Sequence, residues 1–338
     1  MLAPTRITTV MNKKNIAIVA GGDSSEAVIS FKSAQQIAEV IDRDRYNAYT
    51  IFIKGTDWTV KQEGKADIAI DKNNFTFVED GAKTTFDCVL MMIHGTPGEN
   101  GILQAYFDLI RLPYTGCRTF TSALTFDKYA TKKYLEGEGV DMARGFMFRK
   151  GQQVDADALV EELGLPMFVK PNASGSSFGV TKVKSVEQLQ GAIDAAFTEG
   201  DAILIEESIN GIELGNGLIK TPSKALVFPV TEIVPKTEFF DFEAKYTSGM
   251  SEEITPARIP DEVTERVQEL SSHIYDVLGC RGIVRVDYIY SNDKLYFIEI
   301  NTIPGMSQAS IVPQQVRTMG LELRDVLTLE IEDAIERF

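Results

Sequence analysis

Two runs of β-branched and aromatic residues near the end of the chain, joined by a short polar turn, constrain the fold most strongly. Residues 283–290 form the first run, 291–293 the turn and 295–300 the second run. This pattern is typical of a β-hairpin. Because side chains alternate between the two faces of a strand, Arg285 and Asp287 share one face of the first strand. Glu299 and Asn301 likewise share one face of the returning strand.

The four polar side chains of this hairpin are candidates for a metal site. With an odd number of loop residues and Tyr290 opposite Tyr296, Asp287 would face Glu299 at roughly 5 Å between Cβ atoms. Two like charges so placed destabilise a sheet unless a positive group lies between them. Two carboxylates and an amide oxygen suit a hard cation such as Mg²⁺, which also accepts substrate phosphates. A solvated hairpin face in which Arg285 pairs with a carboxylate is the alternative, and the hairpin alone favours neither.

The first third of the chain alternates strand and helix patterns. Strands are expected at 15–20, 46–54 and 86–93, with helices at about 28–41 and 101–110. This alternation is typical of a parallel sheet. We expect this first domain to span 11–118, preceded by an extension or alternative start at 1–10.

The middle of the chain has a different pattern, which predicts an α+β domain over 119–208. After a helix at 121–136, strands at 146–149, 167–170, 179–184 and 202–208 alternate with helices near 155–163 and 186–197. A third domain is expected over 209–338, strand-rich from 213 to 234 and with helices at 261–278 and 321–336. Residues 236–256 are rich in charged and turn-forming residues, which predicts a long loop of the kind that often forms a functional lid.

Composition excludes several classes of partner. The net charge is −15, from 49 acidic and 34 basic residues, so no overall basic field favours nucleic acid or anionic lipid. The three cysteines are far apart without CxxC spacing, which favours buried, reduced thiols. Apolar runs do not approach 18 residues, the length typical of a membrane span. A cytoplasmic protein is expected.

A glycine- and serine-rich segment at 172–179 lies between two predicted strands. Such a loop lets backbone N–H groups converge on an anion and would form a flap over phosphates, although an ordinary hairpin loop has the same composition. Lys170, at the preceding strand end, and Lys128 could bind phosphate oxygens as point charges. Either lysine alone is more often a solvated surface residue.

Carboxylates and a histidine follow other predicted strands. Glu206 and Glu207 end an apolar strand, and Glu213 follows shortly after. Such an edge can bind a purine amine and ribose hydroxyls, although turn glutamates are equally ordinary. His94 follows a predicted parallel strand, at the edge where α/β sheets bind ligands, although a structural histidine with satisfied hydrogen bonds fits the same position. Glu26, at a helix start, is either a partner of the helix dipole or a ligand for a substrate amine.

The order of these segments resembles the D-alanine:D-alanine ligase family of the ATP-grasp superfamily, over nearly the whole chain from residue 14. The matching segments are residues 21–26, 94–101, 113–116, 122–128, 169–171, 175–179, 241–246, 285–287 and 299–306. Each segment is weakly specific, but their joint order is highly specific. The resemblance implies an ATP-grasp fold, α/β and α+β, with an N-terminal Rossmann-like domain.

The resemblance also implies two substrates, ATP and D-alanine, and a role for each matching residue. Two Mg²⁺ ions, with Mn²⁺ as a substitute, would be held by Asp287, Glu299 and Asn301. The nucleotide would be bound by Lys128, Lys170, Ser176, Ser177, Glu206, Glu207, Ile209, Glu213 and Lys245. The amino acids and the reacting groups would be bound by Glu26, His94, Ser176, Lys245, Tyr246, Arg285, Gly305 and Ser310.

The implied reaction joins two D-alanines through an acylphosphate, for cell-wall precursors, and the family resemblance suggests a homodimer. Ser174, Phe178, Phe240 and Phe242 depart from residues common in the family, a difference that concerns the packing of the flap and not the activity. Tyr246 favours an amine as second substrate over D-lactate. Ligases making D-alanyl-D-lactate or D-alanyl-D-serine, a carboxylase-type enzyme and a non-catalytic nucleotide-binding protein are the alternatives.

Overall fold

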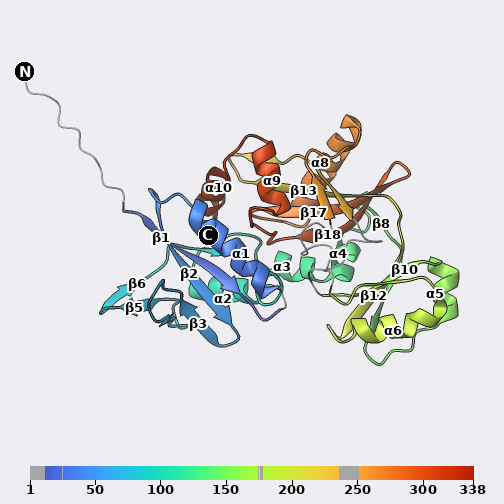
Figure 1. The fold of residues 1–338 in the computed structure, drawn as a ribbon, viewed down its shortest axis with the longest axis horizontal. Helices are drawn as coiled ribbons and strands as arrows, with labels where there is room; N and C mark the ends of the chain where they lie inside the picture. Colours follow the sequence, from blue (N-terminus) through green and yellow to red (C-terminus); the bar gives the residue numbers. More distant parts are fainter. Residues whose placement is uncertain (1–11, 25, 174, 176–177, 236–250) are drawn as a thin grey trace, which may run out of the picture.

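The computed structural model of the chain describes residues 12–24, 26–173, 175, 178–235 and 251–338. These residues form three large sheets and a small hairpin. Figure 1 shows the five-stranded N-terminal sheet and the four-stranded middle sheet at opposite ends of the molecule, with the seven-stranded C-terminal sheet between and above them. No helix in the described ranges combines the length and apolarity that crossing a membrane requires.

The N-terminal sheet has the strand order β4-β3-β2-β1-β7. Strands β1 (Lys14–Gly21), β2 (Tyr46–Lys54) and β7 (Cys88–Met91) are parallel, which confirms the predicted alternation with α1 (Ala27–Val40) and α2 (Ile102–Ile110). The short strands of this region were not predicted, because two to four residues are too few to show a period. They are β3 (Asp57–Val60), β4 (Ile68–Ala69), β5 (Phe77–Glu79) and β6 (Ala82–Thr84).

The single helix predicted at 121–136 is wrong, because the segment forms α3 (Thr119–Phe126) and α4 (Lys128–Tyr134). Asp127 separates them with extended backbone angles (φ −89°, ψ 103°), and its carboxylate accepts a hydrogen bond from Ala130 N at 2.8 Å. Aspartate is a preferred N-cap, which explains why the helix restarts here. The break places Lys128 on the first turn of α4, where its backbone N–H donates to Asn172 O.

The middle sheet has the order β11-β10-β12-β9. All its pairings are antiparallel, and α5 (Ala156–Leu163) and α6 (Val186–Ala196) pack against it through apolar residues such as Leu159 and Ile193. The predicted elements are confirmed here with small shifts at their ends. The strands are β9 (Gly145–Arg149), β10 (Met167–Pro171), β11 (Thr181–Val183) and β12 (Ala202–Glu207).

The C-terminal sheet has the order β16-β15-β13-β17-β18-β8, with β14 paired to β13. Part of the loop predicted at 236–256 is a strand, because β16 (Ser251–Ile254) pairs with β15; residues 236–250 lie outside the described ranges. Helix α9 (Ile311–Thr318) was not predicted, whereas α8 (Asp261–Val277) and α10 (Leu323–Glu336) were. The remaining strands are β8 (Asp141–Met142), β13 (Ile212–Lys220), β14 (Ala225–Val227), β15 (Thr231–Pro235), β17 (Val284–Ser291) and β18 (Lys294–Asn301).

The hairpin of β17 and β18 contains a β-bulge that sets its chemistry. Its turn has two residues, Asn292 and Asp293, both with positive φ, and Tyr290 therefore pairs with Leu295 rather than with Tyr296 as predicted. The register shifts between Tyr288 and Asp287, so that Asp287 pairs with Glu299 after all. An extra residue in one strand bends it and re-aims the side chains that follow. The predicted pairing of the two carboxylates is thus confirmed, but through the bulge and not through the turn.

A buried carboxyl joins α10 to the start of this hairpin. Glu330 is 5% exposed, its Oε1 accepts a hydrogen bond from Ile283 N at 3.0 Å, and burial raises its pKa from 4.5 to about 7. As pH rises from 4.5 to 7, Glu330 loses its proton in the unfolded chain but keeps it in the folded protein. Glu330 therefore destabilises the fold increasingly over that range, and by a constant amount of up to about 3 kcal/mol above it.

We expect Glu330→Gln to stabilise the protein at pH 8.5 but hardly at pH 5, because glutamine keeps the acceptor for Ile283 without a titrating proton. Thermal or urea unfolding at several pH values measures this difference. Glu336→Gln, an exposed glutamate on the same helix, is the matched control. A stability difference that stays constant with pH would contradict the assignment.

Candidate active site

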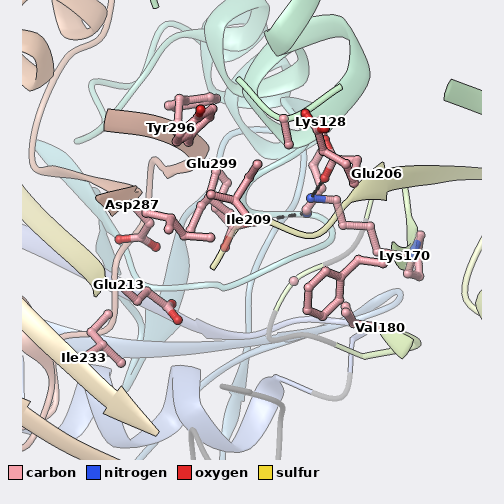
Figure 2. A pocket seen from close by; sticks show the side chains of 18 of the residues that line it. Lys128, Lys170, Val180, Glu206, Ile209, Glu213, Ile233, Asp287, Tyr296 and Glu299 are labelled. Atoms are coloured by element: carbon pink, nitrogen blue, oxygen red, sulfur yellow. Dashed lines mark ion pairs between the residues drawn. The ribbon is translucent and has the colours of Figure 1, made fainter. Parts of the chain in front are cut away.

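A pocket lies between the middle and C-terminal sheets (Figure 2). Its walls come from β10 and β12 on one side and from β13, β15, β17 and β18 on the other, with α4 contributing Lys128. The lining includes most of the residues predicted to bind a nucleotide, together with apolar side chains that fit a flat ring. The latter are Phe168, Phe178, Val180, Ile209, Ile233, Ile289, Tyr296, Phe297 and Ile298.

One end of the pocket is built around the carboxylate of Glu206, at the end of β12. It is 6% exposed and forms ion pairs with Lys170 through Oε2, drawn in Figure 2, and with Lys132 through Oε1. Lys132 Nζ also donates to Ala143 O at 2.6 Å. Burial opposes ionisation of Glu206, but the two lysines outweigh it and hold its pKa below the usual range. Burial lowers the pKa of Lys132, although Glu206 opposes that shift.

Glu207 and Glu213 line the same pocket. Glu207 accepts hydrogen bonds from Arg144 N at 2.8 Å and from its Nε and Nη2 at 3.0 and 2.8 Å. This ion pair holds Glu207 in place at the end of β12. Glu213, on β13, points toward the cavity beside Ile233 (Figure 2).

The acidic residues of the hairpin meet at the other end of the pocket. Arg285 donates from Nε and Nη2 to the two oxygens of Asp287 at 2.7 Å each, and Asn301 Nδ2 donates to Asp287 Oδ2 at 2.9 Å. Glu299 pairs with Lys128 at 3.3 Å. The structure therefore also contains the Arg285 ion pair that the sequence offered as the alternative to a metal site.

The donor set at this end still fits a hard cation. It consists of two carboxylates and an amide on adjacent strands, all of which offer oxygen ligands. In the described part of the chain no three His, Cys, Asp or Glu side chains form a metal site by themselves. A cation here would thus need further oxygens from a bound phosphate or water, as is usual for Mg²⁺.

Glu26 and His94 meet at the edge of the N-terminal sheet. Glu26 is 6% exposed, and glycines border its carboxylate on two sides: a Cβ at Gly95 would lie 2.9 Å from Oε2, and one at Gly175 would lie 2.8 Å from Cδ. Because Gly175 belongs to the loop after β10, Glu26 contacts the predicted flap. Burial and Glu26 raise the pKa of Glu99, whose Oε2 accepts from Gly95 N, to about 8.

His94 is buried and held at both ring nitrogens. Nδ1 donates to Ile303 O at 2.8 Å, and Nε2 lies 3.3 Å from Ser33 Oγ. Burial lowers its pKa, which favours the neutral ring. Gly305 and Ser310 are close to each other near the start of α9, since a Cβ at Gly305 would lie 2.9 Å from Ser310 Oγ. Ser310 Oγ accepts from Ser307 N at 3.1 Å.

The predictions for Ser176, Ser177, Lys245 and Tyr246 fall on residues outside the described ranges, as do those for Ser174, Phe240 and Phe242. Sequence reasoning missed Lys132 and Arg144, which hold Glu206 and Glu207. The sequence pattern could have indicated Lys132, because it follows Lys128 by four residues and so shares its helix face. No sequence pattern indicates Arg144, since its partner is distant in the sequence.

Sheets that face each other across a pocket carrying buried lysines and acidic residues define an ATP-grasp protein. The family model for the D-ala D-ala ligase N-terminus matches residues 15–117, and that for the D-ala D-ala ligase C-terminus matches residues 135–332. The chain belongs to the D-ala D-ala ligase family.

Individual relatives are similar over nearly their whole length. The D-alanine--D-alanine ligase of Phocaeicola vulgatus is 50% identical over 95% of this chain and 99% of its own. The VanG D-Ala:D-Ser ligase of Enterococcus faecalis has a TM-score of 0.84 at 31% identity, covering 96% of this chain and all of its own. The Bacillus anthracis D-alanine--D-alanine ligase complexed with ATP has a TM-score of 0.77 at 26% identity, covering 96% and 98%.

Proposed function

We propose that this ATP-dependent ligase joins two molecules of D-alanine into D-alanyl-D-alanine for peptidoglycan precursors, releasing ADP and phosphate. Relatives near 50% identity over almost the full length carry this activity in their names. The observation that carries the proposal is one pocket lined by Glu206 and Lys170 at one end and by Asp287 and Glu299 at the other, with Asn301 hydrogen-bonded to Asp287. Such an arrangement suits the base and the phosphates of one nucleotide.

The nucleotide would lie along this pocket. Glu206, Glu207 and Ile209 would meet adenine, and Glu213 the ribose hydroxyls. Lys128 and Lys170 would contact the inner phosphates, with Ser176, Ser177 and Lys245 assigned to the phosphates by the family resemblance alone. Asp287, Glu299 and Asn301 would hold two Mg²⁺ ions, with Mn²⁺ as a substitute. The ions would neutralise charge on the phosphates, which is most of what phosphoryl transfer requires.

The amino acids would bind beside the phosphates. Glu26 would pair with the ammonium of the first D-alanine, with neutral His94 nearby. The carboxylate of this first D-alanine attacks the γ-phosphate, forming a C–O–P bond as ADP leaves. The amine of the second D-alanine, after losing a proton, then attacks the acyl carbon and expels phosphate.

The groups around the second step also have assigned roles. Arg285 and Gly305 N–H would stabilise the tetrahedral oxyanion, and Ser310 with Lys245 would hold the second carboxylate. Ser176 and Tyr246 would link Glu26 to the lid. An acylphosphate hydrolyses readily, so exclusion of water is required. Family resemblance further suggests a homodimer, and the product suggests a cytoplasmic location.

The test is ADP release with D-alanine alone, compared with L-alanine alone and with mixtures of D-alanine and D-serine or D-lactate, followed by product analysis. We expect D-alanine-dependent ADP release with Mg²⁺ and D-alanyl-D-alanine as the main product. The D-serine arm is needed because the similar VanG structure is a D-Ala:D-Ser ligase. Folded protein that releases no ADP with D-alanine would refute the proposal.

A further inference from the structure

Lys132 is the one member of the Glu206 cluster to which the proposed function gives no role. It lies one helical turn after Lys128 on α4, and its side chain is 12% exposed. Its Nζ is tied at two points, to Ala143 O at 2.6 Å and to Glu206 Oε1. Lys170 occupies the other oxygen of the same carboxylate. Two cations thus share one buried anion.

This sharing matters once a nucleotide arrives. In the proposed function Lys170 contacts phosphate oxygens, and the several negative charges of ATP compete with Glu206 for it. A buried carboxylate that loses its counter-charge is strongly destabilised or takes up a proton. Lys132 is held by a backbone carbonyl as well, so it can stay with Glu206 while Lys170 moves. Removing Lys132 would remove one of the two charges that lower the pKa of Glu206.

We propose that Lys132 is a positioning residue for the base: it keeps Glu206 ionised and directed into the pocket, and so selects adenine over 6-oxopurines. This inference rests on the proposed function. An ionised carboxylate can only accept hydrogen bonds. It therefore suits the exocyclic amine of adenine and repels the carbonyl oxygen that hypoxanthine has in its place. A protonated Glu206 would donate to that oxygen, and the preference would weaken.

The experiment measures equilibrium binding of ATP and inosine triphosphate to the full chain with Mg²⁺ and without amino acid. For Lys132→Met we expect ATP binding to weaken roughly tenfold, the scale of one charge-assisted hydrogen bond, with a smaller loss for inosine triphosphate. Lys132→Arg should keep most of the preference because it keeps the charge. Lys133→Met is the matched control, since Lys133 is the next residue on α4, with a 52% exposed side chain paired to Glu136. It should bind both nucleotides as the wild type does.

A double-mutant cycle separates positioning from a general structural effect. If Lys132 acts through Glu206, Lys132→Met should add little to the loss that Glu206→Gln alone causes. An unchanged preference for ATP over inosine triphosphate in Lys132→Met would overturn the proposal. So would a loss of ATP affinity from Lys132→Met that is as large in the Glu206→Gln variant as in the wild type. Lys132→Gln replaces the methionine variant if thermal unfolding shows that the latter does not fold. Because binding needs no amino acid, wild-type protein that binds ATP but fails the D-alanine assay would refute only the proposed function.

Discussion

Asp287→Asn should lower D-alanine-dependent ADP release by at least roughly a thousandfold, the largest effect expected of any single substitution here. Asp287 lies opposite Glu299 and accepts a hydrogen bond from Asn301, so it adjoins both of the other proposed metal ligands. Bound metal contributes several kcal/mol of charge stabilisation in the transition state, and each 1.36 kcal/mol is tenfold in rate. Asparagine keeps the shape of the side chain but not its charge.

The same substitution also breaks the two-bond ion pair with Arg285, whose side chain is only 17% exposed. Breaking a buried pair destabilises proteins by about 3–5 kcal/mol, so thermal unfolding must show that the variant is folded at the assay temperature. Asp293→Asn makes the same chemical change at the turn of the same hairpin, where the side chain is 81% exposed. This control should retain full activity. Folded Asp287→Asn protein with more than a tenth of wild-type activity would contradict the metal assignment.

The hairpin also illustrates how far the sequence predicts the site. Alternation along each strand correctly grouped Arg285 with Asp287 and Glu299 with Asn301. The turn chemistry was read wrongly, because Asn292 and Asp293 form a two-residue turn and the bulge then restores the pairing of Asp287 with Glu299. A bulge depends on packing across the sheet and leaves no clear period in one strand. The residue pattern therefore predicts which side chains share a face better than it predicts the register.

Tertiary partners were harder to predict than elements. The long strands β1 and β2 and the helix α8 follow from their periodicity, whereas the restart at Asp127 was missed because helical periodicity continues across it. The ion pairs of Glu206 with Lys132 and of Glu207 with Arg144 join residues more than 60 positions apart. Burial strengthens the effect of these ion pairs on the carboxylates, and burial of a charged side chain cannot be predicted from one sequence.

Gly175→Ala should lower kcat/KM for D-alanine by about a hundredfold without removing any functional group. Gly175 lies against Glu26, where an added Cβ would be 2.8 Å from both Cδ and Oε1 and closer still to Oε2. Gly95 borders Oε2 as well, so the carboxylate has little room to retreat. Glu26 is proposed to bind the first ammonium group, and a misplacement of about 1 Å in a positioning group can cost about a hundredfold in rate.

The readouts distinguish this displacement from general damage. KM for the first D-alanine should rise more than the Kd for ATP, because Glu26 is assigned to the amino acid in the proposed mechanism, although Gly175 itself also lines the nucleotide pocket. Gly191→Ala is the matched control: it lies within α6, an added Cβ there meets nothing within 4 Å, and alanine favours a helix by about 1 kcal/mol. A Gly175→Ala variant within threefold of wild type would contradict the role proposed for Glu26 in binding the first ammonium.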